Sequence, residues 1–306
     1  MSDGRSAIAN PAPASAATGG WIALAPATFV VLWSSGFIGA KFGLPYTGPL
    51  TFLTIRFAAV LIVLLPIALA LRAAWPSSGR DYVHIAVAGL LLHAGYLSGV
   101  FGALHHGMSA GVIALIVGLQ PVLTAMLATA WLGERVTARQ ITGLVLGLAG
   151  VALVVWEKLD LSADAAAFQL ALLALCAITF GTLYQKRYCP HLNLLSGATI
   201  QYAACLGCML ILAPLLEDLH VAWTPQFLFA LGWLVFVLSI ASIMLLYVLI
   251  RHGAATRVTA LFYLVPPTTA LMAWLLFGER FSVWAMLGMA ICAVGVAMVV
   301  RQPRPA

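Results

Sequence analysis

Long apolar segments, separated by short stretches that contain charge, proline or glycine, repeat along the chain. Stretches such as Val60 to Ala70 do not alternate between polar and apolar residues, which favours helices over the strands of a membrane barrel. A membrane-spanning helix needs about 20 such residues. The pattern predicts ten helices, at 21–44, 50–72, 82–104, 108–131, 138–156, 166–188, 195–216, 226–250, 254–277 and 282–300.

Together with the helical pattern, the composition predicts an all-α integral membrane protein. Of the 306 residues, 63% are hydrophobic and 8% are charged, whereas a soluble domain carries about 25% charged residues. Ten spans with short loops leave no room for a soluble catalytic domain, and no motif typical of membrane enzymes is found, so no enzymatic activity is expected. The net charge of +6 comes from scattered basic residues rather than a patch, which argues against nucleic-acid binding.

The basic residues predict the orientation in the membrane. Residues 1–20 are small and polar and are expected to form a flexible tail, and an even number of spans puts both termini on one side. That side would carry 11 of the 15 basic residues, against 3 on the other, with Arg56 inside a span. The positive-inside rule therefore predicts that both termini are cytoplasmic.

The chain also contains an internal repeat. Shifted by 145 positions, residues 109–155 match 254–300 at 15 of 47 positions, including Pro121 with Pro266 and the Gly-Glu-Arg run at 133–135 with that at 278–280. We therefore expect two repeats of five spans each, 21–157 and 166–301. Because five is odd, the second repeat would be inverted, as in alternating-access transporters. Spans one to four and six to nine would surround a central cavity, with the fifth and tenth at the periphery.

Several segments resemble a known family. The run from Leu32 to Phe37, the segment Lys41 to Pro45, Arg56-Phe57 and the two copies of the proline helix with its Gly-Glu-Arg end are similar to the EamA-type, ten-helix branch of the drug/metabolite transporter superfamily. The resemblance covers nearly all of residues 21–300. It implies a metabolite exporter of the bacterial inner membrane, in a branch that includes amino-acid exporters of the YddG type.

Charge inside the spans limits the substrate. All nine acidic residues lie outside the spans or at their ends, so no buried carboxylate can exchange a proton for an organic cation. Neutral, zwitterionic or anionic small molecules are favoured, and transport without proton coupling is one expectation.

Arg56 lies about six residues into the second span; it is either the group that binds a substrate carboxylate or a snorkelling arginine that ties helices. Lys41 has the same two interpretations.

Other polar and aromatic residues inside the spans are candidates for the cavity. His93 and Tyr96 lie near the middle of the third span, and Trp33 shares a helical face with Lys41. Packing within the bundle or an interfacial aromatic belt is the alternative for each of them. The candidate cavity residues are Trp33, Ser34, Lys41, Arg56, His93, Tyr96, Gln185, Tyr247 and Tyr263.

Helix-breaking residues interrupt three of the predicted spans. Gly36, Pro121, Pro266 and Pro267 are candidate gating positions, with static kinks as the alternative. The Glu134-Arg135 and Glu279-Arg280 pairs are expected to fasten helix ends. No metal-ligand spacing is present, and no cofactor is expected.

The sequence thus predicts a carrier for small metabolites, most consistent with amino acids, including aromatic ones, embedded in the lipid bilayer. An exchanger of organic or sugar-phosphate-like anions is the first alternative, although binding such anions would require several lysines or arginines inside the spans. A membrane enzyme or scaffold is the second. The sequence leaves the oligomeric state open, a monomer included.

Overall fold

A computed structural model describes residues 19–132, 138–158, 165–190, 192–242, 245 and 261–300. The helices of the first half are α1 (Gly19–Gly43), η2 (Leu44–Tyr46), α2 (Pro49–Ala70), α3 (Gly79–Gly89), η3 (Leu90–Gly95), α4 (Tyr96–His105), α5 (Ala110–Val117), α6 (Gln120–Leu132) and α7 (Ala138–Lys158). Those of the second half are α8 (Ala165–Tyr188), α9 (Leu194–Leu216), α10 (Pro225–Gly232), η4 (Trp233–Ser242), η5 (Phe262–Leu264), α13 (Val265–Phe277) and α14 (Val283–Val300).

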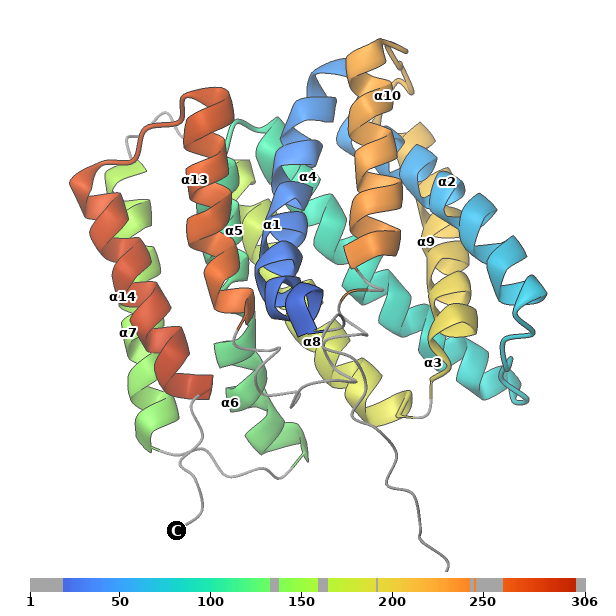
Figure 1. The fold of residues 1–306 in the computed structure, drawn as a ribbon, viewed down its shortest axis with the longest axis horizontal. Helices are drawn as coiled ribbons and strands as arrows, with labels where there is room; N and C mark the ends of the chain where they lie inside the picture. The colour runs from blue at the N-terminus through green and yellow to red at the C-terminus, as the bar shows by residue number, and fades with distance from the viewer. Residues whose placement is uncertain are drawn as a thin grey trace, which may run out of the picture.

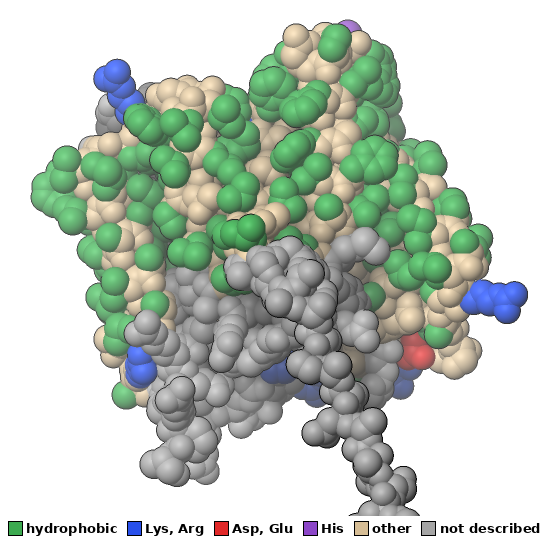
Figure 2. Space-filling model, in the orientation of Figure 1, with side chains coloured by type: hydrophobic (Ala, Val, Ile, Leu, Met, Phe, Trp, Pro, Cys, Tyr) green, Lys and Arg blue, Asp and Glu red, His purple; other side chains and the backbone are tan. Residues whose placement is uncertain are grey.

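The described part of the chain is helical, and its helices overlap the predicted ranges, with ends that differ by up to three residues where the structure describes them, except for η2, which lies mainly between the first two (Figure 1). Six continuous helical segments are long and apolar enough to cross a membrane, and three shorter apolar helices accompany them in the described residues. Their outer surface is apolar too: Ile62 and Leu215, for example, are 72% and 73% exposed. Figure 2 shows such hydrophobic side chains spread over the visible face, with lysines and arginines at its margins. This surface suits lipid, and the chain is a multi-pass membrane protein.

Two helices change to the wider π form in mid-span. The π-helix η3 joins α3 to α4 without a break, and the π-helix η4 continues α10. The hydroxyls of Ser239 and Ser242 donate to carbonyls five residues earlier, those of Leu234 and Val237, which is the spacing of a π turn. Single π segments are frequent at functional sites. The hydropathy pattern predicts the spans but not this change of helix form.

The two proline positions mark real breaks. The fourth predicted span divides into α5 and α6 at Gly118 and Leu119, just before Pro121. In the ninth, the short η5 precedes α13, which has Pro266 in its first turn. Proline suits a helix's first turn because the amide hydrogens there lack a partner within the helix.

Helices α7 and α14 pack against one another at one edge of the molecule (Figure 1). A Cβ added to Gly150 would lie 2.5 Å from the carbonyl oxygen of Gly288, and one added to Gly295 would lie 2.5 Å from that of Gly143. The thiol of Cys292 also donates to a backbone oxygen of α7, that of Gly147, at 3.1 Å. Small residues let the two backbones approach, as is common between membrane helices.

Candidate functional site

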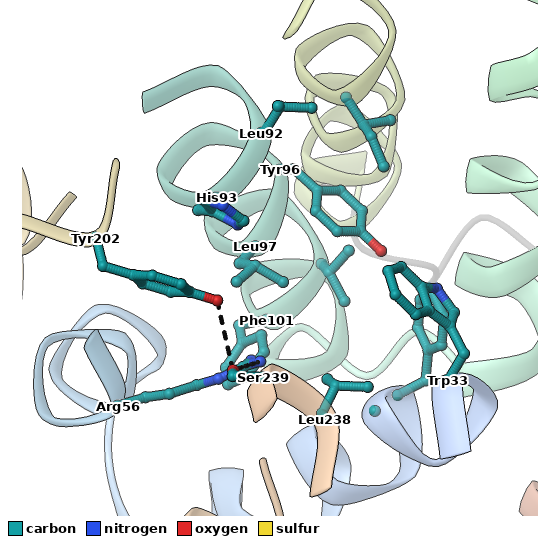
Figure 3. A pocket seen from close by; sticks show the side chains of 14 residues that line it. Trp33, Arg56, Leu92, His93, Tyr96, Leu97, Phe101, Tyr202, Leu238 and Ser239 are labelled. Atoms are coloured by element: carbon teal, nitrogen blue, oxygen red, sulfur yellow. Dashed lines mark hydrogen bonds between the residues drawn. The ribbon is translucent and has the colours of Figure 1, made fainter. Parts of the chain in front are cut away.

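A cavity of about 200 Å³ lies in the middle of the bundle (Figure 3). Its walls come from α1, α2, η3 with α4, α8, α9 and η4, and none of the described side chains that line it is acidic. The lining residues are Trp33, Gly36, Phe37, Arg56, Leu92, His93, Tyr96, Leu97, Val100, Phe101, Ile178, Tyr202, Leu238 and Ser239. Small-molecule sites usually measure about 300–1,000 Å³, so this cavity suits a small ligand.

Arg56 supplies positive charge to this cavity. Its side chain is buried at 3% exposure, and Nη2 donates to the hydroxyl of Ser239 at 3.2 Å. The hydroxyl of Tyr202 donates to the same oxygen at 3.4 Å. The Nε of Arg56 is buried and has no hydrogen-bond acceptor among the described residues. A guanidinium has five N–H donors, so Arg56 has donors to spare for a ligand.

A chain of polar side chains leads from the cavity wall to α8. The Nε2 of His93 lies 3.3 Å from the amide oxygen of Gln201, whose nitrogen donates to Gln185 at 2.8 Å. The His93 ring also stacks on Tyr202, with 4.7 Å between ring centroids. His93 therefore lines the cavity, whereas Gln185 supports it from behind.

A second, smaller cavity of about 50 Å³ adjoins the first one. Both are lined by Trp33, Phe37, Tyr96 and Ile178, and the smaller one also touches Pro121 and Pro266. Trp33 meets the ring of Phe262 edge-on, with 5.0 Å between centroids. The breaks in the fourth and ninth spans thus lie beside the cavity, where a movement of α6 or α13 would change its shape.

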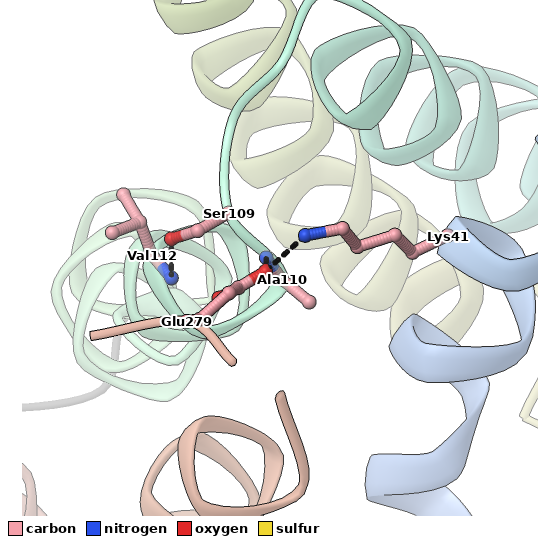
Figure 4. Close-up of polar contacts among 5 residues, drawn as sticks. All are labelled: Lys41, Ser109, Ala110, Val112 and Glu279. Atoms are coloured by element: carbon pink, nitrogen blue, oxygen red, sulfur yellow. Dashed lines mark hydrogen bonds and ion pairs between the residues drawn. The ribbon is translucent and has the colours of Figure 1, made fainter. Parts of the chain in front are cut away.

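Lys41 lies away from both cavities. It forms an ion pair with Glu279 (Figure 4), and its ammonium is 4.7 Å from the ring centroid of Phe277. The same carboxylate oxygen accepts from the backbone N–H of Ala110, the first residue of α5, at 3.4 Å. A carboxylate at a helix N-terminus is favourable. Glu279 therefore joins α1, the start of α5 and the end of α13, as expected of a residue that fastens helix ends.

The remaining candidates divide between packing roles and undescribed positions. Ser34 is fully buried and donates to the carbonyl of Val265 at 3.3 Å, which ties α1 to α13. Gly36 lines the cavity, and an added Cβ there would lie 2.7 Å from Leu238. Pro267 is exposed and lines a different, outward-facing groove. Tyr247 lies outside the described residues, as does the side chain of Tyr263.

Sequence reasoning missed Tyr202 and gave Ser239 no role of its own. Both belong to largely apolar spans, and their proximity depends on how α9 and η4 pack against α2. The polar residue before Tyr202, Gln201, was a signal that this helix faces something other than lipid. Spacing within a single helix cannot show which helices meet.

The family is defined by a match over nearly the whole chain. The model of the EamA-like transporter family matches residues 20–156 and again 166–301. A membrane bundle around a mostly apolar pocket with a few polar groups fits a transporter of small molecules. The chain belongs to the EamA-like transporter family, within the drug/metabolite transporter superfamily.

Curated relatives cover most of the chain. It is 27% identical to "Uncharacterized inner membrane transporter YedA" of Escherichia coli (strain K12), over 86% of each chain. It is 26% identical to "Probable amino-acid metabolite efflux pump" of the same strain, over 87% of this chain and 90% of the relative. It is 28% identical to "Probable terminal-alkyne amino-acid exporter" of Streptantibioticus cattleyicolor, over 89% of this chain and 91% of the relative.

The fold is shared by a crystal structure among the solved structures that match. It aligns with a TM-score of 0.64 over 91% of this chain and 97% of that chain, at 17% sequence identity.

Proposed function

We propose that this protein exports small metabolites across the bacterial inner membrane, by alternating access between two inverted five-helix halves. Amino acids and compounds derived from them are the substrates that best suit it. The observation that carries the proposal is the central cavity, in which buried Arg56 and aromatic walls converge from helices of both halves. Two relatives carry the names of amino-acid exporters, which agrees with this substrate class.

Packing between the halves supports the inversion. Under the shift of 145 residues, Gly150 corresponds to Gly295 and Gly143 to Gly288. The close approach of Gly150 to Gly288 is then the same contact as that of Gly295 to Gly143. Such reciprocity is the signature of a two-fold axis, and it requires α7 and α14 to run antiparallel.

A second helix pair shows a similar but approximate reciprocity, in which the partners Glu217 and Ala74 lie two positions from equivalence. Glu217, after the end of α9, accepts from Thr51 in the first turn of α2, and Ser196 in the first turn of α9 donates to Ala74, beyond the end of α2. Thr51 and Ser196 correspond under the same shift. The π-helix η3 likewise corresponds to 235–240, within η4. In this arrangement the cavity lies between two similar halves, which suits rocking between inward-open and outward-open forms.

The orientation rests on the distribution of basic residues. The positive-inside rule favours cytoplasmic termini, which puts Lys41 and Glu279 at the outer end of the bundle. The export direction follows the relatives' names and carries over to this chain as part of the proposal.

An exchanger of sugar-phosphate-like anions is the alternative. It would need several cationic groups for a doubly charged phosphate, and Arg56 is the one arginine or lysine that lines the described cavity. A monocarboxylate matches this charge better.

Counterflow in proteoliposomes tests the proposed function. Vesicles loaded with unlabelled substrate should take up the labelled form faster than protein-free vesicles, for at least one amino acid or amino-acid-derived carboxylate. Arg56→Gln should slow this exchange at least tenfold, because it removes the charge and the forked donors. No exchange of any neutral or acidic amino acid or its derivatives would refute the proposal. Unchanged exchange by Arg56→Gln would refute the role of Arg56 alone.

A further inference from the structure

The charge of the cavity is unbalanced. The guanidinium of Arg56 is buried, and its Nη2 donates to a neutral hydroxyl, that of Ser239. None of the lining residues that the structure describes is acidic, and the sequence has no Asp or Glu within residues 82–133 or 166–216. Removing a cation from water without an anion beside it is costly. A ligand that brings one carboxylate compensates this charge and can accept two parallel hydrogen bonds from the guanidinium.

The polar atoms around Arg56 are already engaged. The oxygen of Ser239 accepts from Arg56 and from Tyr202, and its own hydrogen goes to the carbonyl of Leu234 at 3.1 Å. The Nε2 of His93 faces Gln201. Figure 3 shows Arg56 and Tyr202 reaching Ser239 from one side, with Trp33 and Tyr96 across the cavity. Among the described lining residues, the hydroxyl of Tyr96, across the cavity, is the group left to accept a hydrogen bond from a second cation.

An α-ammonium group would therefore be poorly placed. In a zwitterionic amino acid the ammonium is attached to the carbon next to the carboxylate, so binding the carboxylate to Arg56 brings two positive charges close together. The low dielectric of the bundle strengthens that repulsion. Aromatic faces such as those of Trp33 and Tyr96 attract cations. They do not restore the hydrogen bonds that an ammonium loses on leaving water, so they offset only part of the cost.

On the basis of the proposed transport function, we propose that the cavity selects monocarboxylates without a free ammonium group over the corresponding zwitterionic amino acids. The class includes 2-hydroxy acids and other amino-acid derivatives in which the amino group has been replaced or made neutral. The hydroxyl of a 2-hydroxy acid occupies the same place as the ammonium without its charge. The aromatic and aliphatic walls, Phe37, Leu97 and Phe101 among them, hold the apolar part.

Isosteric pairs test this selectivity. Phenylalanine and 3-phenyllactate differ chiefly in ammonium against hydroxyl, and leucine and 2-hydroxyisocaproate provide a smaller pair should the phenyl ring be too large. Each labelled compound is measured by counterflow in proteoliposomes at pH 7, and protein-free vesicles correct for passive permeation. Phenethylamine, which keeps the ammonium and lacks the carboxylate, is the third probe. We expect kcat/KM for the hydroxy acid to exceed that for the amino acid about tenfold or more in at least one pair, and no exchange of phenethylamine.

The outcomes separate this inference from the proposed function. Faster or equal exchange of the amino acid in both pairs refutes the selectivity and leaves the transporter intact. No protein-dependent exchange of any compound counts against both. In Arg56→Gln the hydroxy acid should lose its advantage, and a preference that survives this substitution would show that Arg56 is not its source. The wild-type comparison decides the proposal even if the variant does not fold.

Discussion

At the scale of single residues, Ser239 links the charged guanidinium of Arg56 to the helix η4 in the cavity wall. Its hydroxyl accepts from Arg56 and Tyr202 while donating to its own helix, so it fixes the guanidinium relative to η4. Ser242 lies on the same π-helix and also donates to its own backbone, but it does not line the cavity. The two serines therefore separate the effect of a cavity hydroxyl from the effect of a hydroxyl that only supports the helix.

We expect Ser239→Ala to raise the KM for transport about tenfold with little change in kcat, because a hydrogen bond to a charged group contributes roughly 1.5–3 kcal/mol. Tyr202→Phe should have a smaller effect, because its hydroxyl contacts Ser239 and not Arg56 itself. Initial counterflow rates over a range of substrate concentrations measure both. Ser242→Ala is the matched control and should behave as wild type. Equal effects of the two serine substitutions would mean that Ser239 acts only through the helix.

At the level of single residues, the sequence predicts those cavity residues that are unusual because they are polar or charged within an apolar span. Arg56, His93 and Tyr96 stand out in their spans, and all three line the cavity. Lys41 shares a helical face with Trp33 and Phe37, but it lies at the end of α1, where Glu279 pairs with it. Its partner is 238 residues away, and such a contact between distant helix ends has no signal in local periodicity.

At the scale of elements, close approach between helices depends on glycine. Gly150 and Gly295 face backbone atoms of the opposite helix at 2.5 Å from where a Cβ would lie, so α7 and α14 cannot keep their spacing if either gains a side chain. Gly207, in α9, has nothing within 4 Å of that position. This contrast makes a direct test of the packing.

Gly150→Ala and Gly295→Ala should each lower the melting temperature of the purified protein in detergent by several degrees, because overpacking of this kind costs about 1–3 kcal/mol. The two losses should be similar, since the two contacts are equivalent by the repeat. Gly207→Ala should leave the melting temperature unchanged or raise it slightly, because alanine favours the helix. A clear difference between Gly150→Ala and Gly295→Ala would argue against equivalent contacts.

The ion pair at the end of α1 joins an element of each half. Lys41→Gln and Glu279→Gln should each lower the melting temperature, and the double variant should lose little more than the worse single one, because the side chains share one interaction. For a pair exposed at 31% and 11% we expect a coupling of about 1 kcal/mol. The control combines Lys41→Gln with Asp218→Asn, whose effects should add. Full additivity of Lys41→Gln with Glu279→Gln would show that the pair contributes nothing.

Sequence patterns predicted where helices lie better than what form they take. The apolar segments and their breaks at Pro121 and Pro266 follow from local composition. The π form of η3 and η4 does not, because residues 90–95 and 233–242 contain no proline and have an ordinary apolar sequence. A π turn puts one extra residue into the helix, which shifts every later side chain around the axis. His93 and Ser239, which line the cavity, both lie within these π segments.

At the scale of the whole molecule, the distribution of acidic residues governs how transport is driven. Glu217 and Glu279 cap or join helices at their ends, and the sequence has no carboxylate in mid-span. A carrier coupled to protons needs a group inside the membrane that binds and releases a proton during the cycle. Among the described residues that line the cavity, His93 is the one histidine, the residue type that most often relays protons.

We therefore expect transport that runs down the substrate's own electrochemical gradient. In proteoliposomes with the membrane potential clamped at zero by potassium and valinomycin, an imposed pH gradient should produce no protein-dependent accumulation of the best counterflow substrate. Protein-free vesicles account for passive distribution of a weak acid, and a protonophore should leave the counterflow rate unchanged. Accumulation that needs both the protein and the pH gradient would contradict this expectation. Loss of that accumulation in His93→Gln, with counterflow retained, would then assign the proton to the imidazole, because equilibrium exchange requires the binding site but not the coupling group.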